Sequence, residues 1–325
     1  MSLRVGWRRA GIMLLLLGLA VAALLGWLLY TASGRDLLLR QAVAQLPAGS
    51  TLTWTQAKGH LAGPLTLRGV QLRMPMQRDG DCVATAQAAC AMGTLKLDAG
   101  TFTLEAALLP LLTRSVRVHS LRLADARLDL PRDDAPFKLP RWPDVLPMLD
   151  VPVHVHVDAI VMDRLAIAEE GVPQILLQRV RGGVRLDPGA LHIEQLRIDS
   201  DRGQFSAQGD YRPRDNFRSD VRASAIFPAA TGQTAAQLQV YASGDLAALV
   251  VTVDGHAPAP VHAMLRLQGD TATPRWRLQA NSTALDLAVL AGRGETSTPL
   301  AVQLTATGVG GRANVQGQLQ RDDFN

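Results

Sequence analysis

An apolar pattern with a double gap recurs along the chain and constrains its fold more than any other feature. Each copy has two alternating apolar positions, two intervening residues, and two further alternating apolar positions. Alternation with period two is typical of a β-strand with one buried face. The four copies comprise Leu65, Leu67, Val70 and Leu72; Val116, Val118, Leu121 and Leu123; Val155, Val157, Ile160 and Met162; and Leu191, Ile193, Leu196 and Ile198.

The double gap would send the second half of each copy to the opposite face of a regular strand. A β-bulge at the gap restores the face and bends the strand, because two residues then oppose one. Alternation continues beyond the last copy from Phe205. We therefore expect an all-β protein with a long, curved sheet whose apolar residues share one face.

A β-sandwich, in which the same residues would meet a second sheet, is the alternative fold. Sandwiches of this size usually carry aromatic core anchors, whereas this chain has five Trp, three Tyr and six Phe among 325 residues. Hydrophobic residues make up 47% and charged residues 19% of the chain, which excludes a disordered protein and a highly basic nucleic-acid binder.

Glycine and proline divide the chain. Residues 131–152 hold six of the 18 prolines, which excludes a strand there. They predict a linker between two parts of the curved sheet, residues 31–130 and residues 153–325. The linker's apolar residues would lie along the apolar edge of the sheet or cross its outside. A short amphipathic helix is expected over residues 35–46. Turns are expected at Asp98-Ala99-Gly100, Arg181-Gly182-Gly183, Asp187-Pro188-Gly189, Ser200-Asp201-Arg202-Gly203 and Gly269-Asp270.

The N-terminal region predicts a single membrane anchor. Residues 11–30 carry no charge, and a helix of that length spans about 30 Å, the thickness of the hydrocarbon core of a bilayer. The basic residues 1–10 would stay in the cytoplasm, and the rest of the chain would then be exported. A cleaved signal peptide is the alternative, although its apolar region would be shorter. The anchor positions are Gly11, Leu15, Leu19, Leu25, Trp27 and Tyr30.

Two cysteines, Cys82 and Cys90, lie in a polar stretch between strand patterns. In an oxidising compartment, neighbouring cysteines more often pair than bind metal. They are candidates for a disulfide that would add roughly 2 kcal/mol by restricting the unfolded chain. Two unpaired thiols remain the alternative.

No catalytic signature is present in the sequence, and we expect neither an enzyme nor a cofactor. His154, His156 and Asp158 share one strand face, a spacing that suits a metal, but a polar outer face explains them better. Asp79 and Asp81 lack the further oxygen ligands of a calcium loop. Four arginines are expected on the water-exposed face, with contact to lipid headgroups as the alternative; they are Arg181, Arg185, Arg197 and Arg202.

Several stretches resemble a known family. These are the N-terminal anchor, GHLAGPLTLRGVQL at 59–72, SLRLADARLDLP at 120–131, the linker with Trp142, and LHIEQLRIDSDRGQFSAQGDYRP at 191–213. Together they are similar to the N-terminal part of the TamB family, the inner-membrane subunits of the translocation and assembly module, within the AsmA-like group. The resemblance covers nearly the whole chain and rests on repeat patterns.

The resemblance implies a taco-like, antiparallel-rich sheet whose apolar face forms a groove, anchored in the inner membrane with its bulk in the periplasm. It also implies a function in the Gram-negative envelope. Family members carry phospholipid between the inner and outer membranes, and they support assembly of outer-membrane proteins and autotransporters with TamA, an Omp85-type outer-membrane partner. The family's partner-contacting domain has no counterpart in this sequence. The apolar residues of the four copies, together with Phe205, would line the lipid groove. A structural scaffold or secretion-system component that binds protein partners is the second hypothesis, and an anchored periplasmic enzyme is the third.

Overall fold

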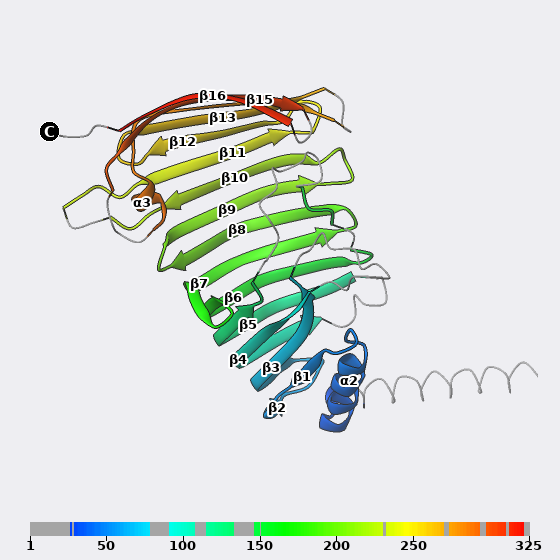
Figure 1. Ribbon diagram of the computed structural model, residues 1–325. Coiled ribbons are helices and arrows are strands. Elements are labelled where there is room, and N and C mark those ends of the chain that lie inside the picture. Colours follow the sequence, from blue (N-terminus) through cyan, green and yellow to red (C-terminus); the bar gives the residue numbers. More distant parts are fainter. Residues whose placement is uncertain are drawn as a thin grey trace, which may run out of the picture.

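One open β-sheet dominates the computed structural model of the chain (Figure 1). The structure describes residues 27, 29–78, 91–107, 115–132, 146–149, 151–229, 232–269, 273–292, 297–309 and 312–321. Within these residues, 16 strands join a single sheet, and almost every strand lies beside its neighbour in sequence. The prediction of an all-β protein is confirmed.

The longest strands, β3 to β7, lie in the first half of the sheet, and two named helices of the described residues lie outside it. Helix α2 spans Ala32–Ala44, close to the predicted helix, and α3 spans Leu287–Leu290. The strands are β1 (Thr51–Thr53), β2 (Gln56–Lys58), β3 (Pro64–Gln77), β4 (Met92–Ala107), β5 (Ser115–Leu130), β6 (His154–Glu169), β7 (Val172–Asp187), β8 (Ala190–Ser200), β9 (Gly203–Arg212), β10 (Arg218–Ile226), β11 (Gln237–Gly244), β12 (Val250–His256), β13 (Pro260–Gln268), β14 (Arg275–Leu285), β15 (Leu300–Val309) and β16 (Arg312–Arg321).

The proline-rich segment explains the one parallel pair among the named strands. Strands β5 and β6 run parallel, whereas the other paired strands are antiparallel. A parallel pair needs a crossover of a dozen or more residues, and the expected linker at 131–152 supplies it. Its described part lies on the apolar side, where Leu146 packs against the cluster of Leu246, Leu249 and Leu267.

Bulges occur at the double gaps of β5, β6 and β8, as the sequence pattern predicts, whereas β3 pairs one-to-one with β4 across its gap, so the bulge predicted there is wrong. On β6, the two residues Asp158 and Ala159 lie opposite a single residue of β7, because Val157 pairs with Val184 and Ile160 with Gly182. Strand β8 shows the same shift between Ile193 and Leu196 against β9. At the second gap residue of β8, Gln195 adopts a φ of 43°, the left-handed conformation expected of some bulges.

A second row of irregular residues crosses four neighbouring strands. Gly69 on β3, Asp125 on β5 and Arg164 on β6 have φ values of 57°, 54° and 55°, and Gly100 on β4 lies between them in the register. The two charged residues of this row form a hydrogen bond, in which Arg164 Nε donates to Asp125 Oδ1 over 2.6 Å. Bends therefore align from strand to strand instead of occurring singly.

Two of the expected turns are wrong. Asp98-Ala99-Gly100 lies within β4, and Arg181-Gly182-Gly183 lies within β7. The glycines serve close packing between bulged strands: a Cβ on Gly182 would lie 2.9 Å from Leu196 Cα, and one on Gly183 would lie 3.1 Å from the Asp158 carbonyl oxygen. The other turn predictions fall between strands as far as the described residues extend.

Gln195 tests whether the bulge conformation limits stability. A β-branched residue tolerates the left-handed region poorly, at a cost of about 1–2 kcal/mol, so we expect Gln195→Val to lower the urea midpoint of the full chain. Asparagine accepts this conformation, and Gln195→Asn should unfold like the wild type. Equal midpoints for the two variants would contradict the bulge.

Candidate functional site

The apolar positions of the sequence pattern lie on one face of the sheet, here called the apolar face. Cross-strand pairing places Val118 beside Val157, Val184 beside Ile193, and Ile198 beside Phe205. Strand β4 joins the first copy to the rest, since Leu104 lies between Leu65 and Leu121. All seventeen predicted groove residues are therefore on this face.

Burial along the apolar face is uneven. Leu65, Leu67, Val70 and Val118 are buried, and the thirteen other predicted groove residues are partly exposed. The described residues contain no second sheet over this face, which excludes a sandwich for this part of the chain.

Three small structures cover parts of the apolar face. Leu39 of α2 packs with Trp54 and Leu61 over the β3–β6 cluster of buried residues. Near β12–β14 the linker contributes Leu146, and Tyr211 donates a hydrogen bond over 2.9 Å to the Pro147 carbonyl. Val289 of α3 packs on Ala236 and Ala257.

The apolar face is least covered at the last strand. Val315 and Leu319 of β16 lie on this face in register with Ala306 and Val302, and they are 60% and 73% exposed. All ten residues of β16 are exposed, so both its faces are open to solvent.

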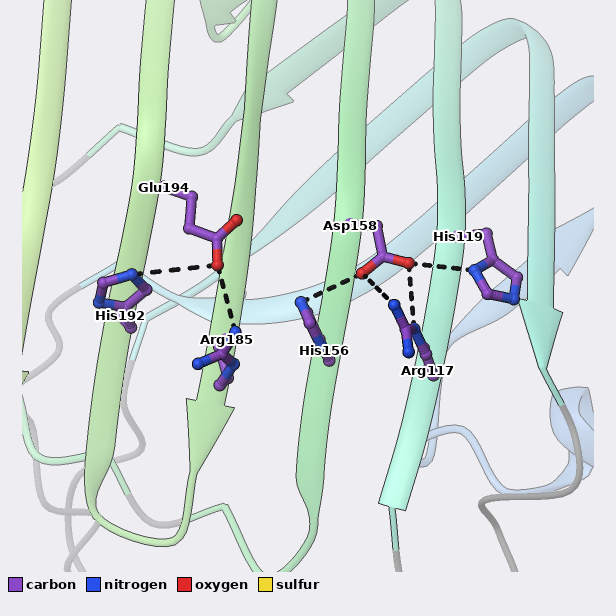
Figure 2. A network of polar contacts seen from close by, with 7 residues as sticks. All are labelled: Arg117, His119, His156, Asp158, Arg185, His192 and Glu194. Carbon is purple, nitrogen blue, oxygen red and sulfur yellow. Dashed lines mark hydrogen bonds and ion pairs between the residues drawn. The ribbon is translucent and has the colours of Figure 1, made fainter.

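The opposite face, here called the polar face, carries a charged network centred on Asp158 (Figure 2). One carboxylate oxygen accepts from Arg117 Nε over 3.1 Å and lies 3.0 Å from His119 Nδ1, and the other lies 3.1 Å from His156 Nε2. The hydrogen bond from Arg117 is the largest cause that lowers the pKa of Asp158 below its ordinary value of 3.8, and it outweighs the opposing effect of burial.

A second group of partners lies two strands away in Figure 2. Glu194 on β8 lies 3.3 Å from Arg185 and 3.9 Å from His192, and His192 also lies 2.9 Å from Asp210. His154 is occupied by Asp187 at 2.6 Å instead of joining His156 and Asp158. No group of three or more candidate metal ligands occurs within the described ranges. The polar-face interpretation of these histidines therefore fits better than a metal site.

A hollow of about 920 Å³ lies on the polar face between β6 and β10. Its lining includes Gly182, Gly183 and Gly209, where an added Cβ would lie within 3.1 Å of the backbone of a neighbouring strand. Arg181, Arg197 and Arg222 also line it. Sequence reasoning missed this hollow because Arg181-Gly182-Gly183 was expected to form a turn. Arg181 and Arg197 lie opposite each other because of the strand register that the bulges set. The sequence alone did not determine that register for β7.

Several predicted positions lie outside the described residues. These are Gly11, Leu15, Leu19 and Leu25 of the anchor, the disulfide candidates Cys82 and Cys90, and the acidic pair Asp79 and Asp81. Trp27 and Tyr30 are described and are 45% and 64% exposed. Among the helices of the described segments, none has the length and apolarity needed to cross a bilayer.

Comparison with known proteins identifies no relative: no family model, no curated protein and no solved structure matches the chain. The site is therefore interpreted from its own geometry.

Replacing the central carboxylate tests the charged network through pH. Because the folded pKa of Asp158 is lowered, ionised Asp158 stabilises the fold above the ordinary value, and this contribution is lost as the pH falls through the lowered folded value. We expect Asp158→Asn to be less stable than the wild type near neutral pH, and to lose less stability on acidification.

Melting temperatures measured from about pH 7 to pH 3 check this expectation. Asp199→Asn is the control, since Asp199 lies on the same face and has no cation partner among the described residues. Parallel pH profiles for wild type and Asp158→Asn would show that the network contributes nothing to stability.

Proposed function

We propose that the chain is a TamB-like envelope protein whose apolar face carries phospholipid acyl chains between the inner and outer membranes. The observation that supports this most is the continuity of the apolar face from β3 to β16 without a second sheet over it. Partly exposed apolar surface of this extent normally marks a binding site. The proposed role is non-catalytic.

The proposal includes a taco-like shape for the sheet, with a groove along its apolar face. Bulges bend strands and increase their local twist. Here bulges form one row across β5 to β8, and the left-handed residues that include Asp125 and Arg164 form a second row. Aligned bends would crease the sheet along a line, with the apolar residues toward the inside. At about 4.8 Å per strand, the described strands would give a groove on the order of 70 Å long.

Acyl chains suit such a surface physically. Each buried CH₂ group would gain roughly 0.8 kcal/mol, and these contacts have no directional requirement. A lipid can then slide along the groove while its headgroup stays in water. The exposed Val315 and Leu319 at β16 would allow the apolar path to continue beyond this strand.

The proposal includes a location and partners. The uncharged run at residues 11–30 would anchor the chain in the inner membrane with its bulk in the periplasm. An Omp85-type protein such as TamA would be the outer-membrane partner. Support for outer-membrane protein and autotransporter assembly belongs to the same proposal.

A structural scaffold is the second candidate function, and strand β16 favours it. Its ten residues are all exposed, and an unpaired edge strand can accept an additional strand from a partner protein. In that case the apolar face would be covered by protein instead of lipid.

Photo-crosslinking from the two faces separates lipid from protein. A photoreactive phenylalanine analogue is placed at Leu121, Ile160 or Ile193 of the full chain in cells, and adducts are identified by mass spectrometry. We expect acyl-chain adducts at these positions, because their side chains lie on the apolar face.

Arg122 provides a matched control for Leu121, since it is the next residue along the same strand and lies on the polar face. Lipid capture there should be at background. Protein adducts alone from the apolar positions would favour the scaffold, and equal lipid capture from both faces would remove the support for a groove.

A further inference from the structure

Three guanidinium groups in the polar-face hollow have no partner among the described residues. They belong to Arg181, Arg197 and Arg222. Two of the carboxylates that line the hollow pair with arginines: Asp158 with Arg117 and Glu194 with Arg185. Asp210 has a histidine partner, His192, and Asp220 has no partner among the described residues. Unpartnered cations therefore outnumber unpartnered anions in this hollow.

Arg181 and Arg197 face each other directly. They are a register pair between β7 and β8, and like charges placed directly opposite on neighbouring strands destabilise a sheet. Their other cross-strand neighbours, Val161 and Ser206, carry no charge. The nearby Glu194 does not neutralise them, because its carboxylate is engaged by Arg185 at 3.3 Å.

The hollow has room for a ligand beside these arginines. It measures about 920 Å³, and Arg181 and Arg197 both line it. Arg222 approaches from β10, where it lies opposite Gln208 of β9. Positive charge thus enters the same space from three strands.

We propose that this hollow binds a small phosphate-bearing anion. Arg181 and Arg197 would donate to its oxygens from adjacent strands, and Arg222 would supply a third cation. The planar guanidinium donates two parallel hydrogen bonds to phosphate oxygens, and three such groups match a phosphate better than a single carboxylate. The site lies on the polar face and does not depend on lipid transfer along the apolar face.

Two soluble probes test binding and separate its sources. The full chain is titrated by calorimetry with inorganic phosphate, and with glycerophosphoglycerol, the deacylated headgroup of a phospholipid, against sodium chloride at equal ionic strength. Binding of the first indicates a free phosphate ligand, and binding of the second alone indicates a lipid headgroup. Either result supports the proposal, and no binding above the salt control overturns it.

Matched variants locate the site. Charge-assisted hydrogen bonds predict that Arg181→Gln and Arg197→Gln each weaken the affinity about tenfold or more. Arg179→Gln is the control, because Arg179 lies on the same face of β7, outside the hollow lining, and pairs with Asp163 at 3.8 Å. Unchanged affinity in both hollow variants would overturn the assignment.

Stability without the anion gives a second readout. Removing one of two opposed charges relieves repulsion, so we expect Arg181→Gln to melt at the same temperature as the wild type or above it. The variant should also lose the rise in melting temperature that the bound probe gives the wild type. A clear drop in melting temperature without probe would show that Arg181 is structural, and would contradict the proposal.

Discussion

The strict alternation of side chains along a β-strand is the constraint on which the rest of this structure depends. A long strand that keeps its apolar residues on one face must either alternate without interruption or contain a bulge wherever the alternation slips. Strands β6 and β8 contain the bulge at Asp158–Ala159 and at Glu194–Gln195. Each bulge keeps the later apolar residues on the face of the earlier ones, and this gives the sheet one continuous apolar face.

The same bulges determine what lies on the polar face. Asp158 and Glu194 occupy bulge positions, and each forms ion pairs with basic side chains close to it. Strand β7 lies between two bulged strands, and the close approach of Leu196 and Asp158 leaves room only for Gly182 and Gly183. Both glycines and Arg181 belong to the lining of the hollow on the polar face. The apolar face and the polar hollow are therefore two consequences of one backbone feature.

Much of the sheet could be predicted from the sequence, because apolar spacing reports directly on strand faces. The pattern from Leu65 to Ile198 predicted which residues share a face, and it predicted the bulges of β5, β6 and β8. On β3 the chain instead changes face through a left-handed Gly69, without a bulge. Glycine misled the turn prediction at Gly100 and Gly182, because a glycine needed for close packing looks the same in sequence as one needed for a turn. The long-range contacts of Leu146 and Val289 were not predictable, since they depend on where distant strands lie.

Spin-label scanning of β6 from Val155 to Ile167 is the most direct test of the account. Single labelled cysteines, in a chain with Cys82 and Cys90 replaced by serine, would report accessibility to a water-soluble quencher. Low accessibility should recur at Val155, Val157, Ile160, Met162, Leu165 and Ile167, with the period slipping at both gaps. An unbroken period of two, or equal accessibility at all positions, would contradict a single apolar face maintained by bulges.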